Sequence, residues 1–209
     1  MIGAQDRVGQ QDTTPRNDIR SLLQNDLGVA LPLHVSLSRP LVLRTEQKDD
    51  FFLSLKDAIG SSGVRAFETT FERLQWHPNE DRTRWFLVLR VADEDDGMLK
   101  LLRTCNSVAV KYGQPKLYES DDTHSGGRQT SRGNSKISDK FHISIAWSLE
   151  EPSGSIRTSE GKNTCNAIDL PPTIHSLRVP FGEVKVRIGQ DVTSMPLDPR
   201  RRRTSGVLS

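Results

Sequence analysis

Two short stretches contain the residues of this sequence whose types and spacing suit catalysis. LHVSLSR spans residues 33–39 and FHISIAW spans residues 141–147, and each places a serine two positions after a histidine. Side chains of an extended strand alternate between its two faces. His34 and Ser36 are therefore expected on one face, and so are His142 and Ser144. The opposite faces would carry Leu33, Val35 and Leu37 in the first stretch, and Phe141, Ile143, Ile145 and Trp147 in the second.

A pair of histidines facing one cleft suits the cleavage of a ribonucleic-acid phosphodiester by its own 2′-hydroxyl. One imidazole takes the proton of that hydroxyl and the other protonates the 5′-oxygen that leaves, because histidine titrates near neutral pH. Ser36 and Ser144 would supply hydrogen-bond donors to the phosphoryl oxygens, where charge develops. The chemistry requires no metal, and neither histidine has a cysteine or carboxylate at ligand spacing.

A single His-x-Ser is ordinarily just the polar face of a strand, and it is the repetition within the same apolar frame that favours catalysis. The other histidines lack this frame. His77 falls in a predicted turn, His124 in a polar insert and His175 in a predicted strand, so we do not expect them to act in catalysis.

Composition limits the class of protein without identifying it. The chain has 209 residues, of which 34% are hydrophobic and 27% are charged, and its formal net charge is +2. This slight basic excess weakly favours an anionic partner. The two cysteines form no metal-binding or disulfide pattern, and no apolar run is long enough to cross a bilayer. We expect a soluble intracellular protein without a membrane partner.

Hydrophobic periodicity predicts elements that alternate between helix and strand along the chain. We expect helices over residues 18–27, 46–59 and 98–110, and strands over residues 33–39, 41–43, 64–76, 82–91, 141–147, 174–179, 183–188 and 192–197. The short connections favour antiparallel pairing, so the predicted class is α+β with mostly antiparallel sheets. Polar segments suggest disorder at 1–17, in an insert at about 119–139 and in a basic tail at 199–209, leaving a domain over 18–198.

The two motifs and their flanks resemble a known family. Two H-x-[ST]-x motifs on strands are the signature of the 2H phosphoesterase superfamily. Within it, LPLHVSLSRPLVL, DKFHISIAW, TRWFLVLRV and VKVRIGQDVTSMPL are similar to segments of the U6 small nuclear RNA 3′-end processing phosphodiesterases. The resemblance covers roughly residues 18–120 and 138–198.

This resemblance implies a fold and a set of roles. The fold would have two lobes around a central groove, with helices on the outer faces. His34 would be the proton acceptor, His142 the proton donor, and Ser36 and Ser144 the ligands of the substrate phosphate. Tyr118 is the candidate for stacking on the terminal base, although the insert separates it from His142.

The resemblance also implies a substrate and a cellular place. The protein would trim the oligouridine 3′ end of U6 RNA in the nucleus as a monomer, without a cofactor, leaving a 2′,3′-cyclic phosphate or a 3′-phosphate. Alternatives are a general 2H cyclic nucleotide phosphodiesterase or a non-catalytic RNA-binding protein. The family has an early strand that the polar residues 1–17 do not match. Basic residues near the motifs, which we expect on the surface or against the RNA backbone, are Arg39, Arg44, Lys136 and Lys140. The run Arg200–Arg203 would be a nuclear-import patch, a further RNA contact or a disordered tail without a role.

Overall fold

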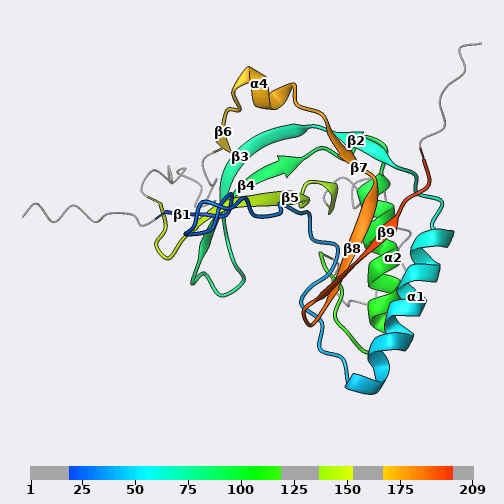
Figure 1. Ribbon diagram of the computed structural model, residues 1–209. Coiled ribbons are helices and arrows are strands. Elements are labelled where there is room, and N and C mark those ends of the chain that lie inside the picture. The colour runs from blue at the N-terminus through cyan, green and yellow to red at the C-terminus, as the bar shows by residue number, and fades with distance from the viewer. Residues whose placement is uncertain (1–18, 119–136, 153–166, 200–209) are drawn as a thin grey trace, which may run out of the picture.

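The structure is a computed structural model that describes residues 19–118, 137–152 and 167–199 (Figure 1). The predicted disordered segment at 1–17 lies outside the described residues, as do most of the predicted insert and all of the predicted tail 199–209 except Pro199. His124 and Lys136 therefore also lie outside them.

A five-stranded sheet forms the larger part of the molecule. Its strands are β1 (Arg20–Ser21), β3 (Phe71–Pro78), β4 (Trp85–Val91), β5 (His142–Ser148) and β6 (Ala167–Ile168), in the order β1-β5-β4-β3-β6. Neighbouring strands are all antiparallel. The predicted hairpin is confirmed as β3 and β4, which arch over the molecule in Figure 1. Asn79 stabilises their turn, because its side-chain oxygen accepts hydrogen bonds from the backbone of Thr83 and Arg84 at 2.9 and 3.0 Å.

Helices lie against the other side of the molecule. The 3-10 helix η1 (Thr45–Gln47) leads into α1 (Lys48–Ser61), and α2 (Gly97–Lys111) runs beside α1; α4 (Pro172–His175) is a single turn. The two longer predicted helices, 46–59 and 98–110, are thus confirmed. The carboxylate of Asp93 accepts hydrogen bonds from the N–H groups of Met98 and Leu99, both at 3.0 Å. It satisfies donors that the first turn of a helix leaves without partners.

Two small antiparallel sheets complete the fold. β2 (Phe67–Thr69) pairs with β7 (Val179–Phe181), and β8 (Glu183–Ile188) pairs with β9 (Asp191–Pro196). The β8–β9 hairpin crosses α2 in Figure 1. The predicted strands 183–188 and 192–197 are confirmed.

The helix α2 joins two hydrophobic clusters. One face packs Leu101, Cys105 and Val108 against residues of α1 and of the β8–β9 hairpin. Another packs Met98, Leu99 and Leu102 against the five-stranded sheet, including Ile143 of β5, and against Phe141, which precedes that strand. The α+β class and the antiparallel sheets predicted from the sequence are confirmed.

The predicted helix at 18–27 is wrong. Arg20 and Ser21 instead form β1, and the chain then turns back on itself with a bridge between Gln24 and Ala30. The physical reason is Asn25, whose side-chain oxygen accepts the N–H groups of Leu27 and Val29 at 3.0 and 2.9 Å. Such side-chain bonds compete with helix formation, and Gly28 at φ 75° completes the turn.

Four predicted strands differ from the structure. The predicted strand 64–76 is divided into β2, which pairs with β7, and β3, which pairs with β4. Residues 33–39 form only one bridge, at Val35, and residues 41–43 form no regular element. Pro32 and Pro40 flank the first stretch, and proline removes a backbone donor that a ladder needs. In the predicted strand 174–179 only Val179 is extended into β7, because Pro172 starts the turn α4, a position that proline favours.

Candidate active site

The second histidine–serine stretch is held inside the sheet. β5 lies between β1 and β4, and its predicted apolar face is buried, with Phe141 at 0% and Ile143 at 6% exposure. His142 and Ser144 are half-buried on the other face. The predicted strand and the predicted faces of these four residues are confirmed.

The first stretch lies beside β5, on the edge that β1 covers further along the strand. There Val35 bridges Ile143 in an antiparallel sense, next to the hydrogen bond from the Leu22 N–H to the Ile145 carbonyl at 2.9 Å. In an antiparallel pair centred on this bridge, residue 34 stands opposite 144 and residue 36 opposite 142. That register would set each histidine diagonal to the other and across from the other stretch's serine, with both motifs on one face.

The first stretch is much more exposed than predicted. Val35 and Leu37 pack against the cluster under the sheet, as expected, but Leu33 is 45% exposed. His34 and Ser36 are exposed. An edge segment with a single bridge gains little burial, so its polar face stays open to solvent.

A bulge in β5 changes the face of Trp147. Leu87 pairs with Ala146 and Val88 pairs with Ser144, which leaves Ile145 without a partner in β4. One extra residue inverts the alternation beyond it. Trp147, which pairs with Phe86, therefore lies on the histidine face, and the prediction that it faces the core is wrong. Its ring packs under the guanidinium groups of Arg20 and Arg84, at 5.0 and 5.1 Å.

His142 is oriented by a backbone carbonyl. Its Nδ1 lies 2.7 Å from the oxygen of Lys140, and because a carbonyl only accepts, Nδ1 carries the proton. Nε2 is therefore the nitrogen available to a substrate. Burial lowers the pKa of His142 below its usual value, the Lys140 carbonyl opposes this, and the charges of Arg90 and His34 lower the pKa further. The influence of His34 on this pKa agrees with the proximity that the bridge implies.

The structure brings Tyr118 to the site in spite of the long separation in sequence. Its hydroxyl lies 3.4 Å from His142 Nδ1, and its ring meets Phe141 edge-on with centroids 6.1 Å apart. Tyr118 has a left-handed backbone, with φ 64°. Burial raises the pKa of its hydroxyl. The ring is therefore held beside the second motif, and its role in stacking on a base stays a prediction.

Two further residues belong to this surface and were not predicted. The strand β3 continues through His77, where a turn was expected, and the His77 ring lies 6.2 Å from that of His142. Arg90 is the direct partner of His142 across β4 and β5. The alternation of TRWFLVLRV would have placed Arg90 on a polar face, but only the pairing of β4 with β5 places it beside His142.

The other basic residues singled out from the sequence have ordinary surroundings. Arg39 pairs with Glu80 at 3.1 Å on the surface, and Arg44 is exposed at the start of η1. The Lys140 ammonium contacts the Tyr118 carbonyl at 3.3 Å and lies 5.6 Å from the Tyr118 ring. Lys140 therefore helps to hold Tyr118 in place, and His175 lies in α4.

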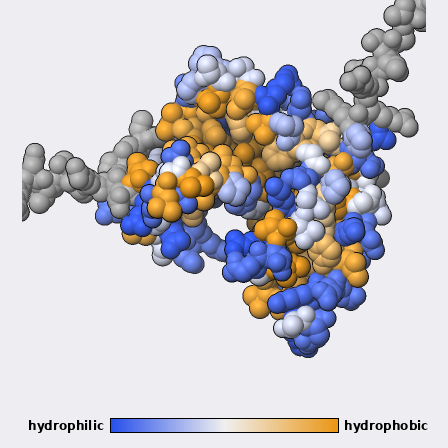
Figure 2. Space-filling model, in the orientation of Figure 1, coloured by the Kyte–Doolittle hydropathy of each residue, from blue (hydrophilic) through white to orange (hydrophobic). Residues whose placement is uncertain are grey.

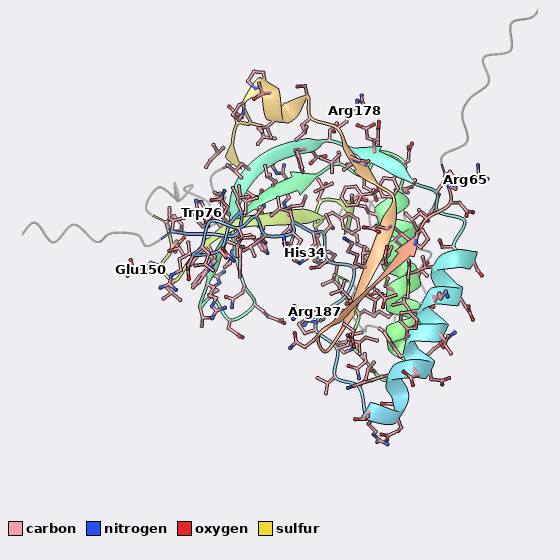
Figure 3. All side chains as sticks on the ribbon, in the orientation of Figure 1. His34, Arg65, Trp76, Glu150, Arg178 and Arg187 are labelled. Carbon is pink, nitrogen blue, oxygen red and sulfur yellow. The ribbon has the colours of Figure 1, made fainter. Side chains whose placement is uncertain are left out.

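The site opens on a notch in the molecular surface. Figure 2 shows this notch between the part that covers the five-stranded sheet and the part that covers the β8–β9 hairpin, with hydrophilic residues along its rims. Figure 3 shows His34 beside it, between β5 and β8. In the described ranges, no group of three or more His, Cys, Asp or Glu side chains is arranged to bind a metal ion. The helices in those ranges are also too short or too polar to span a lipid bilayer.

The fold is α+β. One of its two His-x-Ser stretches is a strand inside an antiparallel sheet, and the other meets that strand at the bridge between Val35 and Ile143. A family model named HVSL, described as an uncharacterised conserved protein, matches residues 4–196. The chain belongs to this family, and its own first motif reads HVSL at residues 34–37.

Curated relatives agree with the resemblance drawn from the motifs. U6 snRNA phosphodiesterase 1 of Neurospora crassa is 35% identical over 200 residues, covering 85% of this chain and 50% of the relative. The protein of the same name from Mus musculus is 26% identical over 165 residues, covering 78% and 54%. The chain thus spans about half the length of these relatives.

Solved structures agree on the fold. The structure of Kluyveromyces marxianus Usb1 has a TM-score of 0.57 at 18% identity, covering 87% of this chain and 82% of that one. The structure of the same protein with uridine monophosphate has a TM-score of 0.56, also at 18% identity, covering 87% and 83%.

Proposed function

We propose that this protein is an RNA phosphodiesterase that trims the oligouridine 3′ end of U6 RNA by transesterification. The observation that supports the proposal is the bridge between Val35 and Ile143, because it joins the two His-x-Ser stretches. The names of the curated relatives support the choice of U6 RNA as substrate.

The acid–base roles follow from the position of the two imidazoles. His34 takes the proton of the 2′-hydroxyl on the penultimate sugar, and that oxygen attacks the adjacent phosphorus. The bond to the 5′-oxygen of the terminal nucleoside breaks, and His142 Nε2 donates the proton that this oxygen needs. The products are a 2′,3′-cyclic phosphate and a free nucleoside. Opening of the cyclic phosphate by water, with the two roles reversed, would give a 3′-phosphate.

Binding of the phosphate is assigned to the two serines. Ser36 and Ser144 lie on the same face as the histidines, so their hydroxyls donate to the non-bridging oxygens as charge develops on them. Tyr118 stacks on the terminal base, a contact that tolerates different sequences because every base has a π-face.

The cellular and chemical setting completes the proposal. The enzyme acts without a metal, because the two histidines supply both proton transfers. It acts in the nucleus, where spliceosomal RNA is processed, and it acts as a monomer, because both motifs come from one chain.

A single assay tests this function. The protein is incubated with a uridine-tailed RNA in the presence of a chelator, and the new 3′ end is analysed by mass. We expect the terminal residue to leave as uridine, later residues to leave as uridine 2′,3′-cyclic phosphate or 3′-phosphate, and the RNA to end in a cyclic or linear phosphate. A matched RNA with 2′-deoxyuridine at the penultimate position should not release its terminal nucleoside.

Other outcomes of this assay would contradict the proposal. Binding of the RNA without turnover would indicate an RNA-binding protein. Opening of small cyclic nucleotides without trimming would indicate a general cyclic nucleotide phosphodiesterase. Loss of activity in chelator that returns with added metal would overturn the metal-free mechanism.

A further inference from the structure

Arg90 places a positive charge beside His142, on the side away from the first motif. Across the sheet the order is the first stretch, then β5 with His142, then β4 with Arg90, then β3 with His77. The register puts Arg90 directly opposite His142, so both side chains leave the same face.

The guanidinium of Arg90 has an unsatisfied donor, because its Nε is buried without a hydrogen-bond partner. Burial and the charge of Arg73 lower the pKa of Arg90, and this outweighs the opposing influence of Tyr118, Asp139 and Glu72. A buried, unpaired donor of this kind is costly unless a ligand completes it.

His77, which pairs with Phe86 in β4, brings a second nitrogen donor close to His142. Its ring lies 6.2 Å from the His142 ring at an angle of 49°, so the two rings are near but do not stack. Partial burial lowers the pKa of His77, and the charges of Arg90 and then His142 lower it further. The positive charges of Arg90 and of protonated His77 and His142 repel one another on this face. An anion bound between them would reduce that repulsion.

The proposed roles decide which part of an RNA reaches this place. His34 acts on the sugar that keeps the phosphate, whereas His142 acts on the nucleoside that leaves. The side of His142 away from His34 is therefore the side of the leaving nucleoside. A phosphate located there is attached to the 3′-oxygen of that nucleoside.

We infer that Arg90 and His77 form a second anion site, which binds a 3′-phosphate on the terminal nucleotide of the RNA. This inference rests on the proposed function for its direction along the RNA. It means that the protein accepts RNA ends that already carry a 3′-phosphate and releases their last residue as a nucleoside 3′-phosphate. Arginine suits such a site because its planar donors match phosphate oxygens.

Ligand binding tests the site without any need for turnover. Uridine 3′,5′-bisphosphate and uridine 5′-monophosphate differ only in the 3′-phosphate, and their affinities are measured by calorimetry. We expect the bisphosphate to bind the unchanged protein about tenfold more tightly, as one charged hydrogen-bonded contact allows. Arg90→Gln should remove most of that ratio, and His77→Gln should reduce it about threefold.

Matched variants separate a lost contact from a damaged fold. Arg178→Gln removes the same charge from an exposed residue that Figure 3 shows on the outer side, away from His34, and should leave the ratio unchanged. Arg90→Lys retains the charge and should restore part of the ratio. Thermal melting of each variant shows whether it is folded.

Turnover tests on which side of the scissile linkage the second anion site binds a phosphate. The ratio of kcat/KM for UpUp over UpU should exceed one in the unchanged protein and fall in Arg90→Gln, while the ratio for pUpU over UpU should not fall. An affinity ratio that Arg90→Gln leaves unchanged, or a loss confined to pUpU, would overturn the inference. If no substrate is turned over, the proposed function fails, and the two affinities still decide whether the anion site exists.

Discussion

The two histidine–serine stretches have the same pattern of residue types but are held in different ways. FHISIAW is a strand between two others, with Phe141 fully buried and His142 fixed by the Lys140 carbonyl. LHVSLSR meets the sheet at one bridge, and its histidine and serine are exposed. The pattern of residues therefore records which side chains share a face, whereas the depth of packing depends on what lies on each side of the strand.

This difference suggests a division of work. The second stretch is a rigid support on which the donor imidazole, Tyr118 and Arg90 are arranged. The first stretch contributes its imidazole from an edge, where small adjustments cost little. Four predictions test this contrast.

Replacement of either histidine by alanine should have the largest effect. We expect His142→Ala and His34→Ala each to lower the rate of trimming by about 10²- to 10⁴-fold, the usual contribution of a general acid or base. The rate is measured on uridine-tailed RNA in chelator. A variant that keeps a rate near that of the unchanged protein would show that its histidine has been given the wrong role.

The flanking apolar residues should separate the stretches by stability. Phe141→Ala removes a ring with 0% exposure and should lower the free energy of unfolding by about 3–5 kcal/mol. Leu33→Ala removes a side chain that is 45% exposed and should cost no more than about 0.5 kcal/mol. Denaturant titration measures both, and equal losses would contradict the contrast.

Tyr118 should show how much the rigid side contributes to substrate binding. Tyr118→Ala should weaken binding of uridine-ended RNA by about 1–3 kcal/mol, the range for one stacked base. Tyr118→Phe retains the ring and should keep most of this affinity. If the two variants lose affinity equally, the hydroxyl near His142 is what matters and stacking is not the role.

The pH dependence should show the smallest effect. Because burial and the charge of Arg90 lower the pKa of His142, its protonated form is lost below the usual range of histidine as pH rises. The proton donor must be protonated, so kcat/KM should already fall on its alkaline side below about pH 6.5. Arg90→Gln removes one of these influences and should move that limb to higher pH. A shift to lower pH would contradict this assignment.

Much of the fold was predictable wherever local pattern and packing agree. The stripe of Phe51, Leu55 and Ile59 predicted α1, and alternation predicted β4 and β5. The helix expected at 18–27 failed because one asparagine side chain bonds its own backbone more favourably than a helical turn would. The order and register of the strands depend on pairing between distant segments. A local pattern of residue types does not predict that pairing.

The candidate site was predictable in part for the same reason. Repetition of the motif identified both histidine–serine pairs, but His77 and Arg90 reach the site only through the order of β3, β4 and β5. Tyr118 was singled out from the family resemblance, and its position beside His142 depends on how the chain returns after a long separation.

Shortening β5 by one residue would not be a neutral change. Ile145 has no partner in β4, so its deletion would remove the bulge. The side chains that follow it in β5 would then move to the opposite face of the sheet. Either the indole of Trp147 would be forced into the interior, or Phe141 and Ile143 would be turned out to water. The number of residues in β5 is thus as strictly constrained as the residue type at position 142. A gap placed here in an alignment of two sequences would assign every following side chain to the wrong face of the strand.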